Sequence, residues 1–248
     1  MRFSFAFSIV LALTASAQAQ QWGDLTGKFV YDGHVPTPAK VDVTKDQEVF
    51  GKEMLVDESL KVGPGGELAN VVIYCRTPNV TVNMELANNV APKVVYDNKG
   101  GKFVPHILTV WLDKQTVVLH NSDPVGHNSN VQPLGDAAIN PLLPANSSVD
   151  HKFNRQQTIP VPVGCNIHPW MKGYILPRNN PYATVSKDDG TFKIEKLPVG
   201  EHEFQLWQEK AGYVDLKDKP KGRFKFTIKP GNNDLGVIKV PADLFKGK

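Results

Sequence analysis

The sequence predicts an all-β protein. Short apolar runs rich in Val, Ile, Phe and Tyr recur along the chain, while apolar residues at the i, i+3, i+4 spacing of a helix are nowhere sustained. The 248 residues also include 20 Gly and 19 Pro, which supply the turns that many short strands need. This length allows one large domain or two small ones to bury a core.

Strands are expected where these runs lie, in the order 28–31, 71–75, 93–96, 106–112, 116–120, 192–194, 203–207 and 223–229. The last run alternates strictly, with Phe224, Phe226 and Ile228 on one face, so that face should be core and the other wet. Asp189-Gly190 has the composition of a hairpin turn, because Gly readily takes a positive φ. Short helices are expected within 45–55 and 241–245.

Composition divides the chain into three stretches. Residues 20–68 contain one strand and then a polar segment interrupted by Gly and Pro; residues 69–178 contain most of the histidines and both cysteines; residues 179–248 contain strands with basic outer faces. Residues 178–181 are the expected linker before the last stretch. No period of 20 to 50 residues repeats, which argues against a propeller or a solenoid.

Residues 1–19 have the features of an export signal. Arg2 precedes the largely apolar run 5–13, and Ala17-Gln18-Ala19 is a cleavage pattern. We therefore expect a periplasmic or secreted protein. No later apolar run has membrane-spanning length and no cysteine lies near the cleavage site, so no membrane anchor is expected. A net charge of +3 gives no broad basic surface for a polyanion, so nucleic acid is not an expected partner.

The segment 164–171 carries the chemistry. It places Cys165, His168 and Met171 at i, i+3 and i+6 of one loop between β-prone segments. A thiolate with imidazole and thioether donors suits copper, and two histidines, a cysteine and a weak axial methionine form the electron-transfer copper set. A second histidine must then come from elsewhere. His127 is the best choice, because it lies in the turn directly after the strand that ends at His120, and such turns present ligands.

Other interpretations of these residues remain open. Cys165 could form a disulfide with Cys75, as the cysteines of exported chains often do. Against this, Cys75 lies in an apolar strand run, where a small free cysteine is ordinary, and pairing would leave the loop spacing as coincidence. His106 and His120 are interpreted as strand histidines without a metal role; His106 could be a ligand only in place of His127.

From about residue 70 to 178 the chain resembles the cupredoxin, or type 1 (blue) copper, family. Two segments carry the resemblance: residues 103–128, which lead to His127 through two strands, and the Cys-x2-His-x2-Met loop at 165–171. The resemblance is greatest to the amicyanin and methylamine-utilisation branch. It implies a Greek-key β-sandwich over 69–178 in which His127, Cys165, His168 and Met171 bind one type 1 copper ion.

The resemblance also implies roles around the metal. Asn128 should pin the cysteine loop by hydrogen bonding. The ring edge of His168 should reach the surface beside Pro169 and Trp170, where a redox partner such as a c-type cytochrome or a dehydrogenase would dock. Residues 20–68 and 179–248 resemble the two halves of a carboxypeptidase-regulatory, transthyretin-like β-sandwich. This resemblance suggests that the copper domain is inserted into an additional split sandwich that adds no catalytic group.

The expected function is one-electron transfer, not catalysis. The four ligands leave no open position for a substrate at the metal, and the chain has no His-x-His pairs of the kind a multicopper oxidase needs. The alternative is a non-redox protein, either a copper chaperone or store or a surface binding protein. A carrier would keep its copper through redox cycles, whereas a chaperone would release it.

Overall fold

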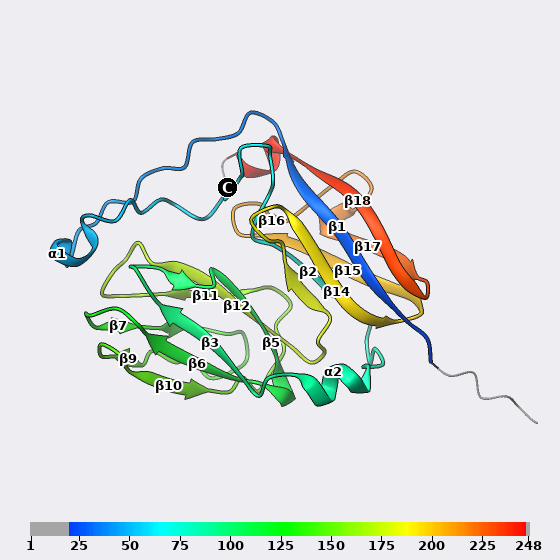
Figure 1. The fold of residues 1–248 in the computed structure, drawn as a ribbon, viewed down its shortest axis with the longest axis horizontal. Helices are drawn as coiled ribbons and strands as arrows, with labels where there is room; N and C mark the ends of the chain where they lie inside the picture. The colour runs from blue at the N-terminus through cyan, green and yellow to red at the C-terminus, as the bar shows by residue number, and fades with distance from the viewer. Residues whose placement is uncertain (1–19, 247–248) are drawn as a thin grey trace, which may run out of the picture.

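The computed structural model describes residues 20–246, and strands dominate this part of the chain (Figure 1). The predicted all-β class is therefore confirmed. The export signal predicted over 1–19 lies outside the described residues. Within residues 20–246, no helix is long and apolar enough to cross a membrane.

The first sandwich comprises two four-stranded sheets in the orders β10-β6-β3-β4 and β5-β12-β11-β8, with a small β7-β9 pair beside them. Its strands are β3 (Lys93–Asn98), β4 (Phe103–Val104), β5 (Ile107–Trp111), β6 (Thr116–Asn121), β7 (His127–Asn128), β8 (Asn130–Val131), β9 (Leu142–Leu143), β10 (Ser148–His151), β11 (Val161–Gly164) and β12 (Lys172–Arg178). Tyr96 and Leu119 of one sheet and Val163 and Ile175 of the other are buried in a shared core.

The second sandwich is built from the two flanks of the chain. Its sheets have the orders β14-β1-β18 and β13-β2-β15-β16, and β17 pairs with β15. The strands are β1 (Trp22–Asp32), β2 (Val71–Cys75), β13 (Ala183–Val185), β14 (Thr191–Pro198), β15 (Gly200–Gln208), β16 (Gly212–Tyr213), β17 (Arg223–Ile228) and β18 (Gly231–Pro241). The pairing of β1 with β14 and β18 joins the two flanks, as the split arrangement requires. The transthyretin-like resemblance itself stays a prediction.

Strand β2 corrects the boundary expected at residue 69. The composition places this strand in the stretch that carries the histidines, but it pairs with β13 and β15 of the second sandwich. The reason is that all five residues of β2 are buried, so both faces need cover. Val71, Ile73 and Cys75 enter the core of the second sandwich, whereas Val72 and Tyr74 point toward the first.

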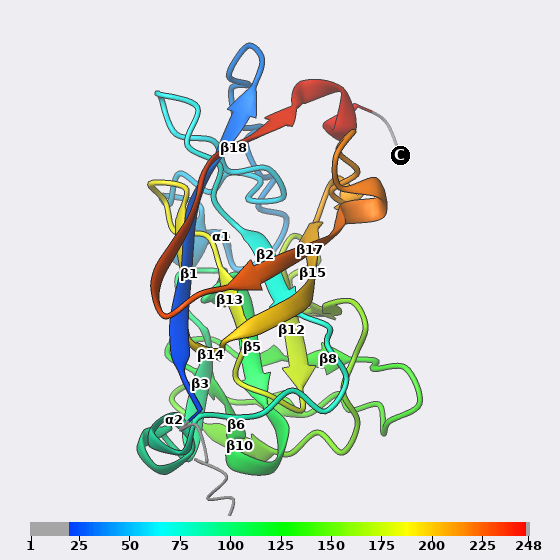
Figure 2. The ribbon, with the colours of Figure 1, turned by 90° about the vertical axis from the view of Figure 1, so that its right-hand side faces the viewer.

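The two sandwiches share an apolar interface. Figures 1 and 2 show β2 and β15 beside β5 and β12, and here Val72 and Trp207 pack with Ile107 and Leu176. Arg178 is buried at the same place and donates hydrogen bonds to the carbonyl oxygens of Gln157 and Cys75 at 2.8 and 3.0 Å. The sandwiches are therefore packed against each other at a desolvated contact.

Between β1 and β2 the chain makes a long excursion that reaches the first sandwich, with α1 (Gln47–Phe50) at its tip (Figure 1). Its two sides run together, because Val41 N donates to Leu55 O at 3.0 Å and Asp57 N donates to Ala39 O at 2.8 Å. We call residues 39–57 the cap hairpin. Of the helix expected within 45–55, only these four residues are helical.

The remaining short elements lie at the edges of the fold. A helix that the sequence did not predict, α2 (Met84–Asn89), begins after Asn83, whose side chain accepts hydrogen bonds from Glu85 N and Leu86 N. The 3-10 turns are η1 (Leu112–Lys114), η2 (Pro220–Gly222) and η3 (Ala242–Phe245); the last is the helix expected within 241–245.

Candidate metal centre

Cys165 and His168 lie on the loop between β11 and β12, which closes on itself. Met171 N donates to His168 O at 2.9 Å, and Cys165 N donates to Met171 O at 3.3 Å. Cys165, His168 and Met171 are all buried. The short hydrogen-bonded loop brings the thiol and the imidazole together, with Cys165 Sγ 3.8 Å from His168 Nδ1.

His127 comes from the opposite side of the site, at the start of β7, and is fully buried. The turn before it is fixed by Asn121, whose side-chain amide donates to Val125 O at 2.8 Å and to Leu143 O at 2.9 Å. Register pairing of His127 with Leu143 of β9 fixes the strand itself. The imidazole is therefore positioned by backbone structure on both sides.

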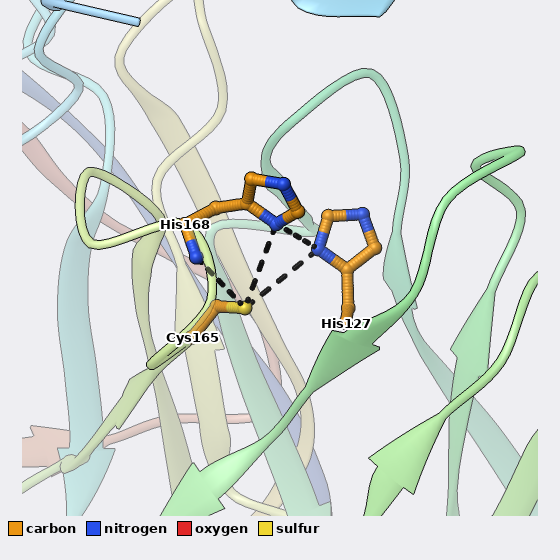
Figure 3. Close-up of side chains that lie close together, drawn as sticks. All are labelled: His127, Cys165 and His168. Atoms are coloured by element: carbon orange, nitrogen blue, oxygen red, sulfur yellow. Dashed lines mark hydrogen bonds between the residues drawn. The ribbon is translucent and has the colours of Figure 1, made fainter. Parts of the chain in front are cut away.

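Three donor atoms converge (Figure 3). Cys165 Sγ lies 3.7 Å from His127 Nδ1 and 3.8 Å from His168 Nδ1, and the two nitrogens are 3.0 Å apart. Typical bonds from a metal are about 2.0 Å to nitrogen and about 2.3 Å to sulfur. At trigonal angles such bonds place N and S about 3.7 Å apart and the two N atoms about 3.0 to 3.5 Å apart, which agrees with the observed distances. Within residues 20–246 no other group of three His, Cys, Asp or Glu side chains comes together in this way.

Each histidine is held at its outer nitrogen by a carboxylate. His127 Nε2 lies 3.0 Å from Asp123 Oδ2, and His168 Nε2 lies 2.6 Å from Asp46 Oδ2. An Nε2–H that donates to a carboxylate leaves the Nδ1 lone pair for a metal, and such partners fix the ring's orientation. Asp123 is itself fixed by the backbone amides of Gly100 and Gly101, at 2.5 and 3.0 Å.

The electrostatics of the site favour a thiolate. Burial raises the pKa of Cys165, but hydrogen bonds with His127 and His168 outweigh burial and lower this pKa to about 6. Burial lowers the pKa of His127, but Asp123 and Cys165 outweigh it and raise this pKa to about 9. Both shifts favour an imidazolium beside a thiolate in the metal-free site, and metal binding at His127 Nδ1 would then release a proton.

Asn128 pins the cysteine loop, as the resemblance implied. Its Oδ1 accepts hydrogen bonds from Asn166 N at 2.8 Å and from Ile167 N at 3.3 Å, and Cys165 Sγ lies 3.5 Å from it. Its own amide donates to Asn140 Oδ1 at 2.5 Å. The loop that carries the thiol is thus tied to the strand that carries the first imidazole.

Met171 is 1% exposed and belongs to the same buried apolar cluster as Cys165. A thioether is a weak, soft ligand that accompanies two imidazoles and a thiolate in electron-transfer copper sites. The donor set at this end of the first sandwich therefore fits one type 1 copper ion.

The expected exposure of His168 is wrong. Its side chain is fully buried, because the cap hairpin lies over the ring. Besides the bond to Asp46, the ring of Phe50 approaches edge-on, with its centroid 5.3 Å from that of His168. Of the two flanking residues, Pro169 is exposed, whereas Trp170 is half-buried and donates from Nε1 to Gly101 O at 3.1 Å.

The sequence interpretation missed three residues that surround the donors, namely Asp123, Asp46 and Phe50. Asp123 had a local signal, since it lies four residues before His127 in the same turn. Asp46 and Phe50 had none: they are separated from His168 by more than a hundred residues, in a stretch that looks like a polar connection.

The other histidines and the second cysteine lie away from this cluster. His106 Nε2 is 2.7 Å from Glu209 Oε2, and His120 Nδ1 is 2.7 Å from Ser148 Oγ. Both cysteines are free and buried, Cys75 in the second sandwich and Cys165 in the first. The disulfide alternative is therefore wrong. Burial raises the pKa of Cys75, which keeps that thiol protonated.

Comparisons with known proteins give matches among solved structures only: no protein-family model and no curated protein matches the chain. The copper-containing nitrite reductase of Thermus scotoductus SA-01 is 24% identical over 40% of this chain, with a TM-score of 0.33, and the match spans only 27% of that enzyme. The reduced Cu(I) form of an amicyanin mutant is 21% identical over 43% of this chain and 98% of its own, with a TM-score of 0.32. A purple cupredoxin from Nitrosopumilus maritimus is 22% identical over 36% of this chain and 100% of its own, with a TM-score of 0.29.

Proposed function

We propose that this chain is an exported type 1 copper protein that carries one electron at a time, with one copper ion held by His127, Cys165, His168 and Met171. The observation that carries the proposal is the convergence of His127 Nδ1, His168 Nδ1 and Cys165 Sγ at metal-binding distances, with all three side chains buried. Among biological metals, copper is the one that uses this trigonal set for electron transfer.

The fold holds the metal-donor atoms in fixed positions. The thiol and one imidazole share a closed loop, the other imidazole sits on β7, and Asn128 links the two segments. Bound copper supplies a one-electron change between the cuprous and cupric states. Because the donors are fixed by backbone hydrogen bonds, either state meets nearly the same ligand positions, which favours rapid transfer.

Electron transfer is preferred to catalysis for a geometric reason. The three converging side chains and Met171 are all buried, and Phe50 covers the imidazole rings. A substrate would need an open coordination position, which this arrangement does not offer. The electron would come from, and pass to, a redox partner such as a c-type cytochrome or a dehydrogenase, in the periplasm or outside the cell.

The test is redox cycling of the copper-loaded protein by voltammetry, in the presence of an excess of a Cu(I) chelator. A carrier should show a reversible one-electron wave over repeated cycles and keep its copper. A chaperone or store should lose copper to the chelator on the first reduction. Met54→Gln is the control variant and should retain copper as the natural chain does, since that methionine is 93% exposed on the surface of the cap hairpin.

A further inference from the structure

The cap hairpin, residues 39–57, is attached to the first sandwich at few points. Within these nineteen residues only Phe50 and Leu55 are buried, with 1% and 6% of their surface exposed. Among the described residues, a single hydrogen bond, between Asp46 and His168, joins residues 39–56 to the first sandwich. Segments with so few buried contacts open at low free-energy cost.

The surface of the first sandwich nevertheless has a contact site, here called the seat, for the side chains of Phe50 and Leu55. Gly101 has a φ of 68° and lies so close to the hairpin that a Cβ there would be 3.1 Å from Phe50 and 3.2 Å from Leu55. The ring of Phe50 also lies against those of His127 and Trp170, with centroids 6.0 and 6.1 Å apart. Phe50 therefore seals the imidazole side of the site.

The seat is not filled completely. A cavity of about 240 Å³ lies between the hairpin and the first sandwich, with Val41 and Leu55 on one side and Trp170 and Met171 on the other. Incomplete packing forfeits dispersion contacts, so this face holds the hairpin less tightly than a filled core would.

We propose that the cap hairpin is a lid that controls access to the metal centre, closed by the Asp46–His168 hydrogen bond and by Phe50. In the closed form His168 has no surface through which to exchange an electron with a docked protein or to release metal. Opening exposes the Nε2 edge of His168 and leaves His127 held by Asp123, which belongs to the first sandwich. The inference rests on the proposed metal site, but its first test needs no metal.

That test is histidine labelling of the metal-free protein with diethyl pyrocarbonate, read residue by residue by mass spectrometry. His34 is exposed and serves as the fast reference. His202, which is buried in the second sandwich with Nε2 2.7 Å from Pro198 O, serves as the slow one. In the lidless variant, residues 42–54 are replaced by an Asn-Gly turn, which the Val41–Leu55 backbone hydrogen bond allows. Phe50→Ala leaves the chain length unchanged and provides the second variant.

His168 should label slowly in the natural chain and about tenfold faster or more in either variant, since its labelling follows the open population, while His202 stays slow. Glu48→Gln, an exposed carboxylate on the same helix, is the matched control and should leave the labelling of His168 unchanged. The lid is disproved if His168 labels as fast as His34 in the natural chain, or stays slow in both variants.

A second measurement uses the copper-loaded protein. Removal of Cu(I) by a chelator should be about tenfold faster in the lidless variant, because the open state is then permanent. Equal removal rates with and without the hairpin would contradict the lid. If no variant binds copper but the labelling result holds, the lid stands and the proposed function fails, so the two claims are separable.

Discussion

Asp123 accepts a hydrogen bond from His127 Nε2 at 3.0 Å, and His127 Nδ1 on the other side of the ring faces Cys165 Sγ. The carboxylate thereby selects which nitrogen is free for a metal. We predict that Asp123→Ala lowers copper affinity by about 10- to 100-fold, the range typical for such supporting partners. Competition with a chelator of known affinity measures it. Asp113→Asn, an exposed carboxylate of the same sandwich, should have no effect; an equal loss there would contradict the assigned role.

The Cys165 thiol of the metal-free protein should ionise with a midpoint near pH 6, because His127 and His168 lower its pKa to about 6 against the effect of burial. Thiolate ultraviolet absorbance, with Cys165→Ser as the blank, follows the titration. Cys75→Ser should leave the midpoint unchanged. His127→Ala should raise it, since the thiolate then loses its cationic partner. A midpoint that ignores His127 would show that the two groups are not coupled.

Asn128→Ala should destabilise the metal-free protein by about 1–3 kcal/mol, because Asn166 N and Ile167 N would lose their shared acceptor. Denaturant unfolding measures the change. Asn130→Ala is the control: its hydrogen bond with Asn166 is exposed, so its removal should cost about 0.5 kcal/mol or less. Equal effects of the two substitutions would argue that Asn128 does not pin the loop.

Met171→Gln should keep copper bound but lower its reduction potential, since an amide oxygen is a harder ligand than a thioether and favours the cupric state. A redox titration followed by absorbance gives the potential, with Met54→Gln as the exposed control. An unchanged potential would remove Met171 from the ligand set.

Gly173→Ala should destabilise the first sandwich by about 1–3 kcal/mol through overpacking. A Cβ at this residue, two positions after Met171, would lie 2.2 Å from Tyr96 Oη and 2.8 Å from His106 O. Gly164→Ala is the matched control in the neighbouring strand, since its nearest contact would be at 4.0 Å. Equal unfolding midpoints for the two variants would contradict this packing.

The sequence predicted strands correctly where a local pattern of apolar residues determines them. The apolar run of β2 (Val71–Cys75) predicts a buried strand with the observed bounds, and the alternation in β17 predicts its buried face. Strand β18 (Gly231–Pro241) was missed, because its first half is polar and Gly-containing and is held by parallel pairing with β1. Propensity does not report such long-range pairing.

In the candidate metal site, too, the features that depend on local sequence could be predicted, whereas those that depend on long-range contacts could not. The convergence of Cys165, His168 and His127 could be predicted, because the loop spacing is local and His127 lies in a turn directly after a strand. Metal binding by these residues and by Met171 stays a prediction. The partnership of β2 with the second sandwich and the position of the cap hairpin over His168 depend on contacts between segments far apart in sequence. No local pattern around Asp46 or Phe50 carries that information, so the exposure of His168 was predicted wrongly.

The most direct test of the central claim is the visible and EPR spectrum of the protein after addition of one equivalent of Cu(II), recorded beside Cys165→Ser. The account predicts an intense thiolate-to-copper absorption band and a narrow copper hyperfine splitting in the natural chain, both absent from the variant. A natural chain that stays colourless, or a variant that keeps the band, would show that Cys165 does not bind copper as a type 1 ligand.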